Sequence, residues 1–353
     1  MTRPTQEADW RIIQGDCTKT LKTLPTDAVD AVVTDPPYAI SSFRQGDETW
    51  DARAIRNHAK RSSRCDISPG EGFEVWCEEW ATECLRVMRP GAHLLAFGSP
   101  RTFHRLVAGV ENAGFEIRDV LMWLYSSGMP KSRRLTGDRG TTLKPAYEPI
   151  LLARKPPDGT IDETLDRHGT GALEIGRCRT NDRWPANVLF SHSHRCRDDQ
   201  CASDCAARQA QAGGIERRRA SQIPIDRVFY GSKASRRERD AGCEGLPARR
   251  VDLFPRAGRH KTARSRPVRN PHPTVKPVDV MRWLVRLTCP ENGLVLDPFC
   301  GSGTTGNACA LEGRRFLGIE RDESFAEIAK ARIAHWSKKP QEAGSGPLDG
   351  RAK

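Results

Sequence analysis

Residues 29–40 read VDAVVTDPPYAI, a buried strand that runs into a rigid polar turn. The segment VDAVV consists mainly of β-branched and small residues, which is typical of a strand buried on both faces of a parallel sheet. The strand must stop at Asp35-Pro36-Pro37-Tyr38, because two consecutive prolines restrict φ and donate no N–H hydrogen bonds. An acid and an aromatic ring are therefore predicted just beyond the carboxyl end of a strand, where open α/β sheets bind ligands.

This turn suits the capture of a planar ring that carries an amino group. Asp35 and the Pro36 carbonyl can accept hydrogen bonds from the amino hydrogens, while Tyr38 stacks on the ring and Pro37 keeps the turn stiff. The alternative is a simple Pro-Pro turn that ends a strand, with an acid before it by chance. A four-residue motif alone does not exclude that alternative.

A second strand-to-turn pattern lies near the C-terminus. Residues 293–309 read GLVLDPFCGSGTTGNAC, in which a buried strand ends at Asp297-Pro298-Phe299 and the turn Gly301-Ser302-Gly303 opens a helix. Glycines let the backbone approach a ligand closely and leave helix N–H groups free to bind it. The next strand, 315–319, ends at Glu320, where an acid is placed to bind ribose hydroxyls. These elements in this order predict a site for a ribose-containing cofactor.

Together, the two stretches resemble the S-adenosylmethionine-dependent DNA methyltransferases that act on exocyclic amino groups, adenine N6 or cytosine N4. The order, with Asp-Pro-Pro-Tyr first and the glycine turn late, resembles the β-class arrangement, and the match covers roughly residues 10–155 and 267–336. The resemblance implies a Rossmann-like α/β fold with a mostly parallel seven-stranded sheet, a circularly permuted motif order and an inserted target-recognition region. It also implies S-adenosylmethionine as the cofactor and double-stranded DNA as the substrate.

The resemblance assigns roles to individual residues. Asp16 lies at a strand end that is near the cofactor's adenine in this family, although it equally suits an N-cap for the helix around Lys19. Lys276, in the proline-rich strip 270–277, corresponds to a residue near the carboxylate of the cofactor, and the alternative for this strip is an interdomain hinge. The other implied site residues are the catalytic Asp35, Pro36, Pro37 and Tyr38, and the cofactor-binding Asp297, Phe299, Gly301, Gly303 and Glu320.

Strands and helices alternate over most of the chain, which predicts an α/β protein. Residues 1–155 are predicted to form the catalytic half of the methyltransferase domain and residues 268–336 its cofactor-binding half. Residues 156–267 are Arg-rich and poor in apolar runs, and by position they correspond to the target-recognition region. Residues 337–353 are predicted to be a disordered polar tail. Trp76 and Trp80, on one apolar helix face, are predicted to belong to the core.

A Cys/His cluster within residues 187–206 is a candidate zinc module. His192 and Cys196 are followed by Cys201 and Cys205, and three Cys with one His is a known zinc ligand set. Zinc would stabilise a module that has few apolar residues. His194 is the alternative to His192 as the fourth ligand. Because the spacing differs from the common C-x2-C pattern, reduced structural cysteines are the alternative to a metal site.

The basic charge is concentrated in one segment. The chain has a formal net charge of +12, and residues 217–269 hold 16 Lys or Arg against 5 Asp or Glu. Such a segment binds a phosphate backbone through salt-sensitive contacts, or it is a basic linker without a partner. The sequence has no apolar run near the ~18 residues of a membrane span and no apolar stretch at its N-terminus. We therefore expect a cytoplasmic protein with reduced cysteines, and the resemblance leaves open a homodimer.

Adenine N6 is the predicted target atom, because Asp-Pro-Pro-Tyr accompanies adenine more often in this family, whereas an initial Ser favours cytosine N4. Two other interpretations receive less support. A glutamine-directed protein methyltransferase usually has Asn as the first residue of its motif and lacks a basic recognition segment. An inactive DNA-binding module would not need Asp35, Tyr38, the glycine turn and Glu320 together.

Overall fold

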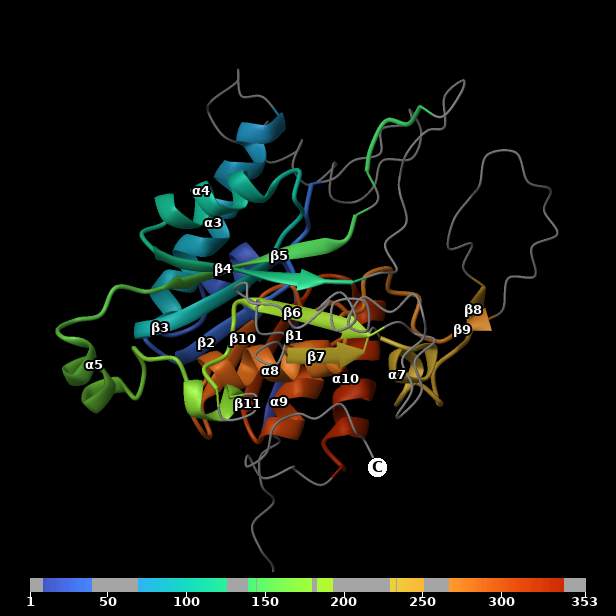
Figure 1. Ribbon diagram of the computed structural model, residues 1–353. Coiled ribbons are helices and arrows are strands. Elements are labelled where there is room, and N and C mark those ends of the chain that lie inside the picture. Colours follow the sequence, from blue (N-terminus) through green and yellow to red (C-terminus); the bar gives the residue numbers. More distant parts are fainter. Residues whose placement is uncertain are drawn as a thin grey trace, which may run out of the picture.

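The computed structural model describes residues 9–39, 69–125, 139–143, 145–179, 183–192, 229–232, 234–250 and 267–339. The strands of its main sheet are β1 (Trp10–Gln14), β2 (Val29–Thr34), β3 (Met88–Phe97), β4 (Glu116–Leu124), β5 (Tyr147–Arg154), β6 (Val188–His192), β7 (Phe229–Ser232), β10 (Leu294–Asp297) and β11 (Arg315–Glu320). Their order is β1-β11-β10-β2-β3-β5-β4-β6-β7 (Figure 1). The predicted tail from residue 340 on, and residues 217–228 and 251–266 of the basic segment, lie outside the described residues.

Most neighbours in this sheet are parallel. The five strands from β1 to β3 run parallel to one another, β5 is antiparallel to both β3 and β4, and β6 and β7 continue parallel to β4. The α/β class and the mostly parallel sheet are confirmed, but the predicted number of seven strands is too small. The two additional strands come from the segment assigned to the insertion. β6 pairs with the backbone groups that β4 would otherwise leave free, and β7 pairs with β6 and becomes the edge strand.

Helices cover both faces of the sheet (Figure 1). Buried side chains of α1 (Cys17–Leu21), α3 (Pro69–Val87) and α4 (Phe103–Asn112) form a core on one face. Those of α8 (Val278–Thr288), α9 (Thr304–Glu312) and α10 (Glu323–Trp336) form a core on the other face. The smaller elements are α5 (Ile161–His168), η1 (Ile175–Cys178), α7 (Arg236–Asp240) and a separate pair of strands, β8 (Arg249–Arg250) and β9 (Pro267–Val268).

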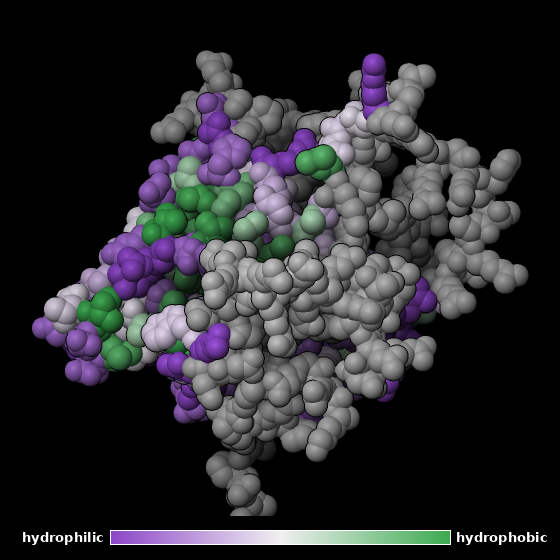
Figure 2. Space-filling view, in the orientation of Figure 1, coloured by the Kyte–Doolittle hydropathy of each residue, from purple (hydrophilic) through white to green (hydrophobic). Residues whose placement is uncertain are grey.

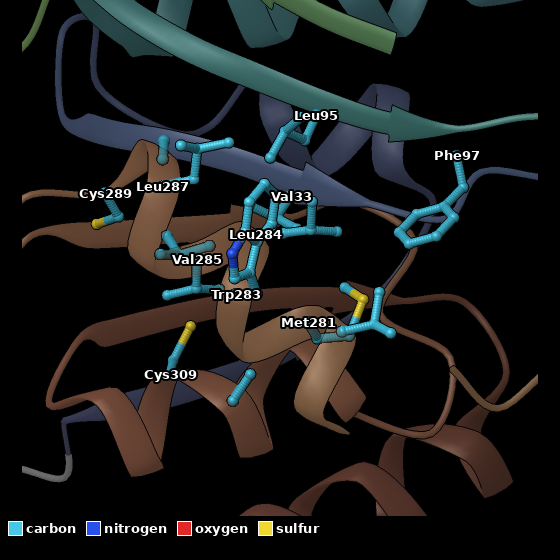
Figure 3. Packing of buried hydrophobic residues seen from close by; sticks show 14 of the residues in the cluster. Val33, Leu95, Phe97, Met281, Trp283, Leu284, Val285, Leu287, Cys289 and Cys309 are labelled. Atoms are coloured by element: carbon cyan, nitrogen blue, oxygen red, sulfur yellow. The ribbon is translucent and has the colours of Figure 1, made fainter. Parts of the chain in front are cut away.

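The core has the packing that the sequence pattern predicts. Trp76 and Trp80 are 7% and 0% exposed in the core below α3, which confirms their structural role. On the other face, Met281 and Leu284 of α8 lie beneath the central strands (Figure 3). The buried cysteines of the described residues carry free thiols and pack as small apolar side chains.

The described surface in Figure 2 mixes polar and apolar side chains. Leu143 and Trp184 are the most exposed of the large apolar residues that the structure describes. A search of the described helices finds none with the length and apolar character needed to cross a membrane.

Candidate active site

The two sequence motifs meet at the carboxyl ends of two neighbouring central strands of the sheet. β2 and β10 are parallel neighbours, with Ala31 opposite Val295, so their carboxyl ends lie side by side. The Thr34 hydroxyl donates a hydrogen bond of 2.7 Å to Asp297 Oδ1, across 263 positions of the chain. The Asp-Pro-Pro-Tyr turn and the glycine turn are therefore adjacent, as the resemblance requires.

Asp297 joins these two turns from below. Its carboxylate accepts hydrogen bonds from the hydroxyls of Thr34 and Thr305, the latter at 2.5 Å, and from the N–H of Phe299 at 3.1 Å. Burial raises the pKa of Asp297 to about 6, although these hydrogen bonds favour the charged form. All three hydrogen bonds come from groups of the protein itself, so Asp297 organises the site in the structure.

The glycine turn depends on close packing. Gly301 and Gly303 have φ values of +52° and +80°, which favour glycine. A Cβ atom on Gly301 would lie 2.8 Å from Nε2 of His272, and one on Gly303 would lie 2.9 Å from the Cα atom of Ala329. The Gly301 N–H donates to Glu320 Oε2 at 2.7 Å, and the Gly303 N–H donates to the Cys300 carbonyl at 2.9 Å. The two N–H groups that we expected to be free for a ligand are thus engaged within the protein.

Glu320 ends β11 beside the glycine turn, and Asp16 lies two residues beyond the end of β1, the parallel neighbour of β11. Glu320 accepts N–H groups from Gly301 and, at 2.8 Å, from Asp322, and burial raises its pKa. Each carboxylate oxygen has a second lone pair, so Glu320 can still accept a ribose hydroxyl. Asp16 caps α1, since it accepts the Lys19 N–H at 3.4 Å and the Thr18 hydroxyl at 2.6 Å. This is one of the two roles that the sequence left open for Asp16.

Phe299 packs beneath the turn and belongs to the core on the α3 face. Its ring centroid lies 5.4 Å from that of Trp76 and 5.5 Å from that of Trp80. Phe299 is only partly buried, so one side of the residue remains at the edge of the site. The carboxylates that can accept ribose hydroxyls, the compact glycine turn and this ring together fit a ribose-containing cofactor.

A partly buried ionic cluster surrounds the Asp-Pro-Pro-Tyr turn. Asp35 Oδ1 accepts the Tyr38 hydroxyl at 2.6 Å, and Asp35 Oδ2 accepts a hydrogen bond from the Lys276 ammonium. The Lys276 Nζ atom also lies 3.3 Å from Glu148 Oε2, and the Tyr38 oxygen lies 3.0 Å from the same carboxylate oxygen. Two carboxylates, one ammonium and one phenol therefore share hydrogen bonds at the end of β2.

Burial and charge act against each other in this cluster. Burial raises the pKa of Asp35, and the nearby Lys276 ammonium opposes this effect only in part. Burial alone would lower the pKa of Lys276, but the carboxylates of Asp35 and Glu148 outweigh it and raise that pKa. Burial also raises the pKa of Tyr38 well above its usual value, so the phenol stays protonated. Lys276 is therefore a cation, although its side chain is only 7% exposed.

Tyr38 is held through both its backbone and its ring. The Thr102 hydroxyl, just before α4, donates to the Tyr38 carbonyl at 2.7 Å. Lys276 Nζ lies 5.4 Å from the centroid of the Tyr38 ring and 4.8 Å from that of Phe97. Pro36 is buried and Pro37 is half-buried, so the turn presents its acid and its ring from a rigid backbone.

Glu148 belongs to this cluster although no motif in the sequence points to it. Its only sequence signal is an acid near the start of a strand, β5, whose next residues are buried. The structure adds a contact of Lys276 that the sequence did not indicate, because its ammonium pairs with Asp35. The position of Lys276 near the carboxylate of the cofactor stays a prediction.

Most of the predicted zinc ligands lie outside the residues that the structure describes. Cys196, Cys201 and Cys205, and the alternative ligand His194, lie outside the described residues. His192 ends β6, where its backbone pairs with Ser232 of β7. Within the described ranges, no group of three or more His, Cys, Asp or Glu residues could hold a metal ion. The zinc module stays a prediction.

This arrangement, with an Asp-Pro-Pro-Tyr turn and a glycine turn on neighbouring parallel strands, defines an α/β enzyme of the methyltransferase type. Residues 29–331 match the family model for N6 and N4 methylases, described as DNA methylase, and the chain belongs to this family.

Individual relatives agree with the family assignment. The chain is 23% identical to the type II methyltransferase M.HindIII of Haemophilus influenzae, over 91% of this chain and 94% of that protein. It is 22% identical to the type II methyltransferase M.HinfI of the same species, over 94% of this chain and 70% of that protein. The solved PvuII DNA methyltransferase (cytosine-N4-specific) has a TM-score of 0.54 at 15% identity, over 92% of this chain and 86% of its own, which shows a common fold.

Proposed function

We propose that this protein transfers a methyl group from S-adenosylmethionine to the N6 atom of adenine at a specific sequence in double-stranded DNA. The observation that carries the proposal is the Asp35–Tyr38 turn at the end of β2, hydrogen-bonded through Thr34 to the motif that opens α9. This arrangement supports a target amino group and a methyl donor that meet at one sheet edge.

The cofactor would lie over the ends of β1, β10 and β11. Glu320 would accept the ribose hydroxyls, and the compact turn at Gly301 and Gly303 would let the cofactor approach the backbone. Asp16 and Phe299 would border its adenine. When bound, S-adenosylmethionine supplies a methyl group that its sulfonium already activates for transfer.

Asp35 would prepare the nucleophile. The lone pair of an aromatic amino group is delocalised into the ring, so the nitrogen is a weak nucleophile. Asp35 and the Pro36 carbonyl would accept its two hydrogens, favour tetrahedral geometry and return the lone pair to nitrogen. As the N–C bond forms and the S–C bond breaks, the positive charge moves to the nitrogen, where Asp35 stabilises it. The nitrogen then loses one proton, and Asp35 is its nearest acceptor in this scheme.

The target base would be extruded from the duplex before reaction, because its amino group is inaccessible inside the helix. Extrusion costs a few kcal/mol, and stacking on Tyr38, worth about 1–3 kcal/mol, would offset much of this cost. The basic segment 217–269 would bind the phosphate backbone, and residues 156–267 would read the target sequence. The location of β6 and β7 at the sheet edge supports contact between this region and the catalytic half.

Modification-sensitive sequencing of DNA from cells that express the protein tests this proposal. We expect N6-methyladenine in one sequence context and no such mark in cells that express the Asp35→Ala variant. Detection of N4-methylcytosine instead would show that the target base is cytosine, and the same amino chemistry would apply. No mark on either base, with the protein present and folded, would refute the methyltransferase proposal.

A further inference from the structure

Lys276 places an ammonium group where the proposed reaction needs an amino group. Its Nζ atom hydrogen-bonds to Asp35, lies 3.2 Å from the Tyr38 hydroxyl, and lies 4.8 Å from the centroid of the Phe97 ring. Aromatic faces attract cations. A carboxylate beside aromatic rings is the environment that the proposed mechanism provides for the target nitrogen, which also donates hydrogens and becomes positively charged. Lys276 therefore resembles the reacting nitrogen in both charge and hydrogen bonding.

This contact leaves Asp35 occupied. One of its oxygens accepts the Tyr38 hydroxyl and the other accepts the Lys276 ammonium. Each oxygen keeps a second lone pair, but a target amino group that donates to Asp35 would lie beside the Lys276 ammonium and compete with it for the same carboxylate charge. The phenol is tied to the same rigid turn as Asp35, whereas a lysine side chain is long and flexible. Lys276 is the group that can move.

Glu148 is a second carboxylate within reach of the same ammonium. Its Oε2 atom lies 3.3 Å from Lys276 Nζ, so a small movement exchanges one ion pair for another. A buried ammonium without any carboxylate would be strongly unfavourable. Glu148 removes this obstacle, because Lys276 stays paired after it leaves Asp35.

Resting on the proposed function, we propose that Lys276 is an internal competitor for Asp35, and that Glu148 is the positioning residue that takes over its ammonium when the target amino group binds. The charges agree with this role. Two carboxylates and one ammonium carry a net charge of −1, which becomes neutral when the methylated nitrogen gains its positive charge. Without Lys276, the two carboxylates would lie together without a cation between them, and the charge of Glu148 would raise the pKa of Asp35 further.

Three further titratable groups face this cluster from neighbouring elements: Asp297 at the end of β10, Tyr125 just after β4, and His272 in the strip before α8. Burial lowers the pKa of His272 to about 3 and raises that of Tyr125, so both are neutral near pH 7. None of these three residues is substituted in the variants below. Differences in the pH profile between those variants therefore report on Lys276 and Glu148.

The test compares Lys276→Met, Glu148→Gln and the double variant, in methyl-transfer assays from pH 5 to 9 on DNA that the wild-type protein methylates. In Lys276→Met the acid limb of kcat/KM should move to higher pH by about 1 to 3 on the pH scale, because an opposite charge that lowered the pKa of Asp35 is lost. The double variant should return towards the wild-type limb, because the repelling charge of Glu148 is lost as well.

Glu148→Gln tests the transfer of the ammonium directly. Glutamine is isosteric and keeps a polar group at the position of Glu148 Oε2, 3.0 Å from the Tyr38 oxygen, so a purely structural role would be largely preserved. We expect kcat/KM for DNA to fall by about 10- to 100-fold, because Lys276 then has Asp35 as its only carboxylate, and the Kd of S-adenosylmethionine to stay unchanged. Glu148→Asp restores the charge and should recover part of the loss. Circular dichroism and urea unfolding check that each variant is folded.

Two results would overturn the inference without touching the proposed function. One is a Lys276→Met variant with weaker S-adenosylmethionine binding but an unshifted acid limb, which would make Lys276 a cofactor ligand. The other is a folded Glu148→Gln variant with wild-type kcat/KM, a result that stays decisive if Lys276→Met does not fold. A wild-type protein that methylates no DNA would instead refute the proposed function itself.

Discussion

Replacement of Asp35 by alanine is expected to abolish methyl transfer while the protein remains folded. Loss of an electrostatic partner of the reacting atoms typically costs about 100- to 1000-fold in rate, and loss of a proton acceptor costs about as much. Because Asp35 has both roles in the proposed mechanism, we expect a loss of at least about 1000-fold, which corresponds to about 4 kcal/mol in the activation free energy.

The structure also sets the effect of this change on stability. Removal of one partner of a buried ion pair usually costs about 3–5 kcal/mol, because the other charge is left alone. Here Lys276 keeps Glu148 at 3.3 Å, so the charge stays paired. We therefore expect the free energy of unfolding of Asp35→Ala to fall by only about 1.5–3 kcal/mol, the cost of a lost charged hydrogen bond.

Radiolabelled methyl transfer to DNA and urea unfolding measure these two quantities, and calorimetry measures S-adenosylmethionine binding, which should be unchanged. Asp166→Asn, at an exposed position on α5, is the matched control and should behave as wild type. A folded Asp35→Ala variant with activity within about tenfold of wild type would refute the assignment of Asp35. A loss of stability above about 3 kcal/mol would show that Glu148 does not compensate for Asp35.

Three further predictions concern the same edge of the sheet. Tyr38→Ala should weaken capture of an extruded base by about 1–3 kcal/mol, seen as a smaller 2-aminopurine fluorescence change, whereas Tyr38→Phe keeps the ring and the signal. Gly303→Ala should lower the free energy of unfolding by about 2–4 kcal/mol, because φ is +80° and the new Cβ would lie 2.9 Å from the Cα atom of Ala329. Gly176→Ala, with nothing within 4 Å of its added Cβ, is the control and should cost less than about 1 kcal/mol in a urea titration. Burial raises the pKa of Asp297 from 3.8 to about 6 in the folded state. Between these two values the folded protein binds more protons than the unfolded chain, so the contribution of Asp297 to the free energy of unfolding falls as the pH rises. Urea unfolding between pH 4 and 7 should show a decline of up to about 3 kcal/mol that is absent in Asp297→Asn, and equal pH dependence in the two proteins would contradict the assignment.

The local chemistry of the two turns could be read from the sequence. The consecutive prolines stop β2 whatever surrounds it, and the alternation of buried strands and helices leads to an α/β sheet because each buried strand needs cover on both faces. The apolar helix face with Trp76 and Trp80 was likewise predictable, since its 3.6-residue period is a property of the local chain.

The strand order of the nine-stranded sheet and the surroundings of Asp35 could not be predicted from such local patterns. β6 and β7, from the segment that the sequence predicts to be an insertion, are short. They belong to the main sheet because β6 pairs with the free edge of β4 and β7 pairs with β6. Glu148 and Lys276 stand 128 positions apart, and Lys276 stands 241 positions from Asp35. No local pattern encodes such a contact, because it depends on which strands become neighbours.

Sequence alone determined where the chain turns and which side chains each turn presents, since proline and glycine act on their own backbone. The tertiary structure decided that the Lys276 ammonium pairs with Asp35 of the first turn. The physical reason is that charge pairing acts through space: burial makes an isolated charge unfavourable, so the fold brings two carboxylates and one ammonium together from three distant segments.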